Sequence, residues 1–419
     1  MQQIILSNSE ITRVFFTILL LLTFSQVFGY IFWRFSMPKV IGEIFGGFLL
    51  GPSCLGHISP ELFKWLFNSF PGQGKILSMI YWFGLVFLMF ISGFEVKGSI
   101  FKGNFKFIIA LIIGATVLPL IAGWGAPYLY DFAPFIGTKE NILSLKIIIA
   151  ISVAVTSIPV ISKIFIDLNI INTRFSKIVI SAATLQDILL WIALSIATGL
   201  VEQKVMNGFF IFSKILITIL FFFFAVVVSP YLYRFLNSFR FNLLKKSSNM
   251  SYILVICFLF AAVASVLEVN VVFGAFLAGI LVSLNDEQEF EKAKDHVKQL
   301  GVSFLVPMYF AIVGLKLNIL KSFNFEFFVF FLFFSTFFEL VGVMTFLTLI
   351  KTKLRTSFNF AMAMNTRGGP GIVLATIAFD LGIINEVFFV TLVLTAIVTS
   401  LASGWWFRFL QNKKIPLME

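Results

Sequence analysis

Thirteen apolar segments follow one another along this chain and constrain its fold more than any single motif. About 20 apolar residues in a helix are needed to cross ~30 Å of hydrocarbon. Of all residues, 59% are hydrophobic and 12% are charged, against about 25% charged in soluble domains. The segments lie at 11–34, 38–56, 76–96, 104–130, 143–167, 174–201, 209–238, 250–268, 271–285, 300–319, 324–351, 355–380 and 386–410. The sequence therefore predicts an all-α integral membrane protein with about 13 transmembrane helices embedded in a lipid bilayer.

Basic residues divide unevenly between the two sides of this arrangement. With strict alternation, one side collects 21 Lys and Arg and the other nine, while Arg367 falls inside a span. Because positive residues accumulate in cytoplasmic loops, we expect the N-terminus outside and the C-terminus in the cytoplasm, in a prokaryotic inner (plasma) membrane. The net charge of +11 then reflects topology, and we expect no nucleic-acid partner. Two histidines and two cysteines indicate neither a metal centre nor a disulfide framework.

Two short motifs recur between the two halves of the chain. Residues 42–50 resemble residues 274–281, and residues 87–96 resemble residues 308–317. Each pair occupies the second and third segment of its half. We therefore predict, within one transmembrane domain spanning 1–419, a repeat at 11–201, a connecting helix at 209–238 and a repeat at 250–410. The seven-segment displacement inverts the second repeat relative to the first.

The fifth segment of each repeat contains residues that interrupt a helix. The first carries Thr156, Ser157 and Pro159; the second carries Asn365, Thr366, Arg367, Gly368, Gly369, Pro370 and Gly371. Proline removes an amide donor and clashes with the preceding turn, although Pro159 alone is equally consistent with an ordinary kink. Irregular backbone at membrane depth persists where protein or a water-filled cavity surrounds it. The pattern predicts two broken helices whose free carbonyls and half-helix dipoles line a polar site.

Asp187 lies near the middle of the sixth segment, inside an apolar run from Phe175 to Leu200. A carboxylate near the centre of a spanning helix costs at least ~2.5–3.5 kcal/mol on insertion scales. We interpret Asp187 as an ion and proton site; the alternative is a structural acid paired with a buried base or hydroxyl. Glu339, in the eleventh segment, is a second intramembrane acid, and its alternative is a structural hydrogen bond or a protonated acid near lipid.

Several stretches resemble the monovalent cation:proton antiporter-2 family, which includes the Kef-type potassium systems. They are 36–44 with Leu50-Gly51-Pro52, Ser181 to Asp187, the Phe310–Gly314–Leu317 segment, and Met364 to Gly368. The resemblance covers essentially the whole chain. It implies a homodimer with a scaffold domain and a mobile core domain with two crossed broken helices, which exchanges Na⁺ or K⁺ for H⁺ by an elevator-like movement.

Residue by residue, the resemblance assigns the ion- and proton-binding aspartate to Asp187. It places Thr156 and Ser157 on the first helix break and Thr366 to Gly371 on the second. Two positions depart from the electrogenic members: Gln186 precedes Asp187, as in Kef-type proteins, and Glu339 stands where many members have a lysine. Kef-type proteins usually carry a soluble nucleotide-binding domain after the last helix. No such C-terminal domain is expected here, so that regulation is either absent or supplied by a separate subunit.

The chemistry of antiport requires a group that holds either a proton or a cation but not both. Asp187 fits this role, with oxygen ligands from Thr156, Ser157, the Gln186 amide and freed carbonyls. One carboxylate beside a neutral Gln186 predicts electroneutral one-for-one exchange, used for pH homeostasis, with no cofactor. If Glu339 faced the same cavity, a second proton would make the cycle electrogenic.

Other readings remain open at this stage. Arg367 is expected to cap carbonyls or pair with an acid such as Glu43, but beside glycine amides it could also form an anion site. The chain would then be an organic-anion carrier of the same fold. A channel or a partner-dependent membrane subunit is a further alternative, whereas no catalytic constellation favours an enzyme. Residue types do not decide between Na⁺ and K⁺, although the Gln186-Asp187 pair favours K⁺ weakly.

Overall fold

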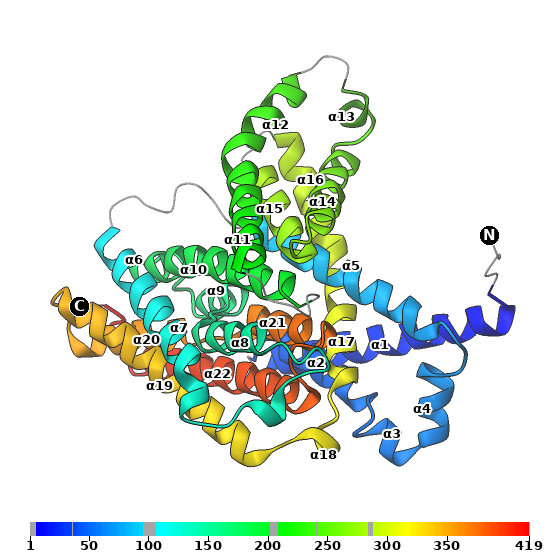
Figure 1. Ribbon diagram of the computed structural model, residues 1–419, viewed down its shortest axis with the longest axis horizontal. Coiled ribbons are helices and arrows are strands. Elements are labelled where there is room, and N and C mark those ends of the chain that lie inside the picture. Colours follow the sequence, from blue (N-terminus) through cyan, green and yellow to red (C-terminus); the bar gives the residue numbers. More distant parts are fainter. Residues whose placement is uncertain are drawn as a thin grey trace. The chain divides into compact units, whose positions relative to one another are not determined.

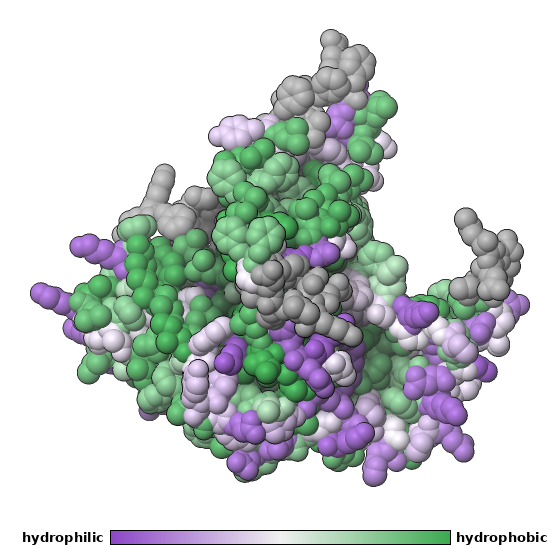
Figure 2. Space-filling model, in the orientation of Figure 1, coloured by the Kyte–Doolittle hydropathy of each residue, from purple (hydrophilic) through white to green (hydrophobic). Residues whose placement is uncertain are grey.

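The protein is described from a computed structural model (Figure 1) that covers residues 6–35, 37–94, 105–201, 208–238, 242–283 and 288–418, with the side chains of 210, 211, 234–238, 288 and 289 not described. In these ranges the secondary structure is helical, apart from an isolated β-bridge between Ile136 and Ile384. Ten of the described helices are long and apolar enough to cross a membrane. Figure 2 shows apolar side chains over α6 and α11, whose Phe105 and Phe212 are exposed. The chain is thus an all-helical integral membrane protein.

Each of the thirteen predicted segments contains at least one helix. In chain order the helices of these segments are α1 (Asn8–Arg34), α2 (Lys39–Leu49), α5 (Gln73–Phe94), α6–η1–α7 (Phe105–Ile112, Ile113–Val117, Leu118–Gly125), α8 and α9 (Ile142–Ala154, Ile158–Asp167), α10 (Arg174–Gly199), α11–η4–α12 (Gly208–Phe223, Phe224–Val228, Ser229–Ser238), α14 (Asn249–Val266), α15 (Val271–Ser283), η5–α17 (Gly301–Leu305, Val306–Lys316), α19 (Phe325–Leu349), α20 and α21 (Leu354–Met364, Gly368–Asp380) and α22 (Glu386–Asn412). Shorter helices complete the described part: α3 (Leu55–Ile58), α4 (Pro60–Phe67), η2 (Ala126–Tyr128), η3 (Ala133–Phe135), α13 (Leu243–Ser247), α16 (Gln288–Leu300) and α18 (Ile319–Ser322).

Two segments differ in length from the prediction. The second was expected at 38–56, but α2 ends at Leu49 because the following Leu50-Gly51-Pro52 forms a turn. The tenth was expected to begin at residue 300. Instead, the polar helix α16 continues through η5 into α17, so that the span covers Phe290–Lys316.

The chain forms two compact units. The first comprises Met1–Leu88 and His296–Phe323, and the second comprises Met89–Asp295 and Asn324–Glu419. In the first unit, α2 packs against α1 and α17. In the second, one apolar core joins α9, α10, α20 and α22, and includes Phe165, Phe175 and Phe360. Asp187 and both predicted helix breaks belong to this second unit.

Two pairs of close glycine contacts reproduce the internal repeat found in the sequence. In the first unit, a Cβ added at Gly47 would lie closer than 3.0 Å to the Ala311 carbonyl, and one at Gly314 equally close to the Ile44 carbonyl. In the second unit, the same holds for Gly279 against Phe90 and for Gly93 against Phe276. The motif alignment equates Gly47 with Gly279, Ala311 with Phe90, Gly314 with Gly93, and Ile44 with Phe276. The second helix of each repeat therefore packs on the third helix of the other repeat through equivalent residues. These helix pairs are α2 with α17 and α15 with α5.

Among the described residues, three helices contain a π-helical turn, and each turn ends two residues before a proline. The turns η1, η4 and η5 precede Pro119, Pro230 and Pro307. A proline ring clashes with the carbonyl four residues earlier and offers it no amide. The widened turn accommodates the ring and frees that carbonyl. Glutamine amides take up two of these groups: Gln26 donates to the Ser303 carbonyl (3.0 Å) and Gln186 to the Ala115 carbonyl (2.8 Å).

Candidate functional site

The first helix break separates α8 from α9. Residues 155–157 leave the helical conformation, with Val155 at φ −76° and ψ 132°. The Ser157 hydroxyl then caps α9 by accepting a hydrogen bond from the Val160 amide (3.4 Å). Pro159 lies in the first turn of α9, where a backbone amide has no helical partner in any case. Pro159 therefore marks the start of a half-helix and does not kink a continuous one.

The second break separates α20 from α21 and depends on glycine. Gly368 has a φ of +32°, and a Cβ there would lie closer than 3.0 Å to the side chains of Val160 and Ser157 on the other broken helix. The Gly368 amide donates to the Ser400 hydroxyl of α22 (3.1 Å). A larger residue would push the two broken helices apart.

The two breaks are hydrogen-bonded to each other. The Thr156 hydroxyl donates to the Met364 carbonyl (2.6 Å), and the Ser157 amide donates to the Thr366 carbonyl (2.5 Å). These four residues are buried. Thr366 lies four residues before Pro370, so its carbonyl is one that the proline ring frees. The broken helices thus cross, and each supplies hydrogen-bond partners for backbone groups that the other leaves unpaired at its break.

Asp187 lies beside this crossing. It is 6% exposed, and its carboxylate has no hydrogen bond or ion pair with any described residue. It lines a small cavity of about 10 Å³, together with Val155 at the first break and Pro370 at the second. That volume is about the minimum that one water molecule needs. The remaining lining residues are apolar: Ile151, Leu190, Trp191, Leu194 and Leu374.

The helix ends around this cavity carry opposite partial charges. Val155 follows the C-terminus of α8, and Pro370 lies in the first turn of α21. A helix carries about +0.5 elementary charge at its N-terminus and −0.5 at its C-terminus. The crossing therefore places a weakly positive and a weakly negative end near one carboxylate, an environment that can receive either a proton or a cation.

Gln186 lies next to Asp187 in sequence but has a different environment. Its side-chain amide donates to the Ala115 carbonyl of η1 (2.8 Å) and also to the Ala154 carbonyl at the end of α8. Its Oε1 atom is buried without a hydrogen-bond partner among the described residues. Gln186 therefore ties α10 to two freed carbonyls and does not line the cavity of Asp187.

Arg367 and Glu339 form a second buried polar group. Arg367 donates from Nη1 to the carbonyls of Ser152 (2.5 Å) and Val153 (2.9 Å), and from Nη2 to Asn365 Oδ1 (3.3 Å). Its guanidinium interacts electrostatically with the Glu339 carboxylate. Within the described part of the chain, neither Glu339 oxygen has a hydrogen-bond partner, and Glu339 is not among the residues that line the cavity of Asp187.

The predicted site residues thus form separate groups. The second unit brings Asp187 next to both helix breaks, while the hydroxyls of Thr156 and Ser157 are engaged in the crossing and its cap. Arg367 caps carbonyls, as expected, but its acidic neighbour is Glu339. Glu43, the acid expected beside it, lies in the first unit and pairs with Lys39 (3.5 Å). Sequence reasoning missed Leu190, Trp191 and Leu194. Their spacing of three, four and seven residues from Asp187 marks the same face of α10.

Comparison with a solved structure shows the fold, and a family profile shows the class of protein. The fold matches that of the sodium proton antiporter MjNhaP1 from Methanocaldococcus jannaschii with a TM-score of 0.69, over 97% of this chain and 99% of that one, at 14% sequence identity. This likeness shows the fold of the chain. The profile described as "Sodium/hydrogen exchanger, transmembrane" matches residues 15–413, and the chain belongs to this family of monovalent cation:proton antiporters.

Curated relatives agree with this family. The chain is 25% identical to the Na⁺/H⁺ antiporter NhaS4 of Synechocystis over 95% of this chain and 97% of that protein. It is 25% identical to a Na⁺/H⁺ antiporter of Enterococcus hirae over 94% of this chain and 97% of that protein. It is 29% identical to K⁺/H⁺ antiporter 1 of Saccharomyces cerevisiae over 94% of this chain but 46% of that protein. Membership of the monovalent cation:proton antiporters is confirmed, whereas the antiporter-2 family and its Kef-type subgroup stay predictions.

Proposed function

We propose that this protein exchanges a monovalent cation, Na⁺ or K⁺, for H⁺ across a membrane, with Asp187 as the shared proton and cation site. The observation that carries the proposal is the Asp187 carboxylate, 6% exposed and without a partner among the described residues, in a cavity at two crossed helix breaks. A structural acid would have a base or hydroxyl beside it. An intramembrane carboxylate without one is costly, and binding a proton or a cation removes that cost.

We further propose that the exchange is one-for-one and electroneutral. Gln186 is neutral and holds two carbonyls, and Glu339 interacts with Arg367 and does not line the cavity of Asp187. A single carboxylate that carries either one proton or one monovalent cation moves no net charge per cycle. The arrangement of Glu339 supports this reading over one with a second transported proton.

The resemblance to cation:proton antiporters supports an elevator-type mechanism in a homodimer. Asp187 and both breaks belong to one compact unit, so a movement of that unit would carry the complete site. We place the protein in a plasma membrane, with the N-terminus outside and the C-terminus in the cytoplasm.

The organic-anion alternative gains no support from the site. It requires an arginine whose donors are available to a ligand. Two Arg367 nitrogens instead donate to carbonyls and an amide oxygen, and its charge faces Glu339. A carboxylate without a counter-charge at Asp187 would also repel an anion.

The test is proton movement in liposomes that contain a pH-sensitive dye. A pulse of Na⁺ or K⁺ outside should change the internal pH with wild type, and Asp187→Asn should lower the rate at least about tenfold, because an amide cannot exchange a proton. Asp380→Asn, which changes an exposed acid, is the matched control. Undiminished exchange by Asp187→Asn would rule out this mechanism. No exchange by wild type with either cation would favour the carrier or partner-dependent readings.

Glu339→Gln separates the two stoichiometries. In the same liposomes, with valinomycin and a clamped K⁺ gradient setting the voltage and Na⁺ as the driving ion, wild-type exchange should be independent of voltage. Glu339→Gln should leave that independence unchanged, although lower protein stability is expected from an uncompensated Arg367. A voltage-dependent rate in wild type that Glu339→Gln abolishes would show that Glu339 carries a second proton.

A further inference from the structure

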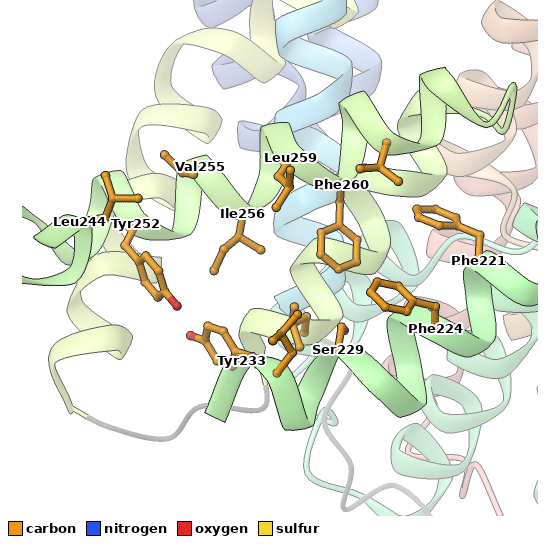
Figure 3. Close-up of a pocket in the computed structure, with 13 residues that line it drawn as sticks. Phe221, Phe224, Ser229, Tyr233, Leu244, Tyr252, Val255, Ile256, Leu259 and Phe260 are labelled. Atoms are coloured by element: carbon orange, nitrogen blue, oxygen red, sulfur yellow. The ribbon is translucent and has the colours of Figure 1, made fainter. Parts of the chain in front are cut away.

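A second and larger cavity lies within the second unit, between the connecting helix α11–η4–α12 and α14 (Figure 3). Its volume is about 410 Å³. The lining residues are Phe221, Phe224, Ser229, Leu232, Tyr233, Leu244, Tyr252, Val255, Ile256, Leu259, Phe260, Val263 and Leu281. None of them contributes to the site around Asp187.

Apart from the hydroxyls of Tyr233 and Tyr252 at one end, the lining offers an ion or a polar solute nothing to bind. Ser229 is the one small polar residue in it, and its hydroxyl donates within the helix to the Ala225 carbonyl (2.5 Å). The volume lies within the ~300–1,000 Å³ typical of small-molecule pockets. A helix with its side chains is about 10–12 Å wide, so a helix from a second copy could place only single side chains inside. The shape and chemistry suit a hydrocarbon chain.

The cavity is accessible from the outer face of α14. Val255, Leu259 and Val263 follow one another at four-residue intervals and are 43%, 56% and 38% exposed. This stripe lies on a helix that is apolar and long enough to cross a membrane. A lipid chain can therefore enter sideways from the bilayer.

One end of the cavity is polar and basic. Figure 3 shows the hydroxyls of Tyr233 and Tyr252 pointing toward each other at the end near Leu244; their rings are stacked with centroids 6.1 Å apart. Leu244 belongs to the short helix α13, which also carries Lys245 and Lys246. Lys245 Nζ lies 5.1 Å from the ring centroid of Phe290. Tyrosines at the level of lipid headgroups and basic pockets on the cytoplasmic side are features of anionic-lipid sites, and charge distribution predicts this side to be cytoplasmic.

We propose that this cavity is a phospholipid site that takes an acyl chain along Phe221, Phe260 and Tyr252 and holds an anionic headgroup at Lys245 and Lys246. The charge of the two lysines selects an anionic lipid over a zwitterionic one. The lipid packs between the connecting helix and α14, and the site is independent of the transport chemistry at Asp187.

The experiment measures lipid binding to the purified protein in detergent. Dioleoylphosphatidylglycerol and dioleoylphosphatidylcholine are titrated, and bound lipid is counted by native mass spectrometry. Val255→Trp should fill the cavity and lower phosphatidylglycerol binding at least about tenfold. Val266→Trp places the same residue on the same helix at a position that is 83% exposed and outside the lining, and should bind as wild type does.

A second pair of variants tests the headgroup. Lys245→Gln with Lys246→Gln should remove the preference for phosphatidylglycerol, whereas Lys351→Gln with Lys413→Gln, on the same predicted side, should keep it. Leu259→Trp repeats the cavity test if Val255→Trp does not give a monodisperse protein. Equal binding of the two lipids by wild type, or undiminished binding in both cavity variants, would overturn the proposal. So would a change from dimer to monomer in Val255→Trp without loss of lipid, because a second copy would then cover the cavity.

Discussion

Gln186 and Asp187 are consecutive residues of α10, yet their side chains have opposite surroundings. Successive residues on a helix point about 100° apart, since a turn takes 3.6 residues. Asp187 therefore faces the helix crossing, while Gln186 faces η1 and the end of α8. The side-chain amide of Gln186 fixes the position and rotation of α10 relative to η1 and α8. This in turn determines where the carboxylate of Asp187 lies.

Replacing Gln186 should destabilise the protein. Gln186→Leu leaves the buried carbonyls of Ala115 and Ala154 without their donor, at about 1–3 kcal/mol for each unsatisfied group. The apparent melting temperature in detergent should fall, whereas Leu189→Ala, at an exposed position of the same helix, should change it little. Gln186→Glu should be worse than Gln186→Leu, because a carboxylate would face two carbonyl oxygens. Equal melting temperatures for all variants would contradict the role of the amide.

At this scale, sequence reasoning finds the acid but not its neighbours. The cost of a carboxylate in hydrocarbon singles out Asp187 from sequence alone. Spacing gives the depth of Thr156 and Ser157 in the membrane, but not the direction of their hydroxyls. The Thr156 hydroxyl bonds the other broken helix, and the Ser157 hydroxyl caps its own. Glu339 and Arg367 are 28 residues apart in numbering, and their interaction depends on how α19 packs, which no local pattern encodes.

Among the helices, prolines and glycines determine most of the departures from regular geometry. Pro119 and Pro307 each follow a π-helical turn and free a carbonyl that a glutamine amide takes up. The two prolines are visible in the sequence, but no local pattern identifies the glutamine that donates to each freed carbonyl. The two helix breaks were readable, because proline and glycine cluster at equivalent places in both repeats.

Gly47→Ala tests the helix contacts that these glycines permit. The added methyl group would meet the Ala311 carbonyl closer than 3.0 Å, and backbone on both sides leaves no flexible atom to move. Overpacking of this kind typically costs about 1–3 kcal/mol. We expect a lower melting temperature or loss of monodisperse protein. Gly279→Ala, at the equivalent residue, should behave alike, and Gly74→Ala, which has open space, should resemble wild type.

For the molecule as a whole, apolar segments and basic residues carry most of the information. Thirteen predicted segments each contain a helix, and the all-helical fold is confirmed by a solved antiporter with a TM-score of 0.69. No local pattern gives the residues of each compact unit, because these depend on which helices of the two repeats pack against each other. Hydrophobicity locates a helix in the membrane but does not select its neighbour.

The orientation of the chain in the membrane is testable with single cysteines. In a background of Cys54→Ala and Cys257→Ala, Lys413→Cys should react with a membrane-impermeant maleimide in inverted vesicles, and Lys139→Cys in intact cells. Both positions are exposed. We expect this orientation because 21 basic residues lie on the predicted cytoplasmic side and nine on the other. Labelling of both positions from one side would refute the odd number of spans between them.

The short helix α2 has a consequence for how the protein is made. With 11 residues, it is about 16 Å long, roughly half of the ~30 Å hydrocarbon core. Its partner α17 follows roughly 260 residues later, a delay on the order of ten seconds to a minute at ~5–20 residues/s. During that interval α1 holds it, because the backbone around Phe24 and Phe28 closely approaches Gly46 and Gly42. Biogenesis therefore passes through a stage in which the half-length helix α2 is packed against α1 before α17 is available.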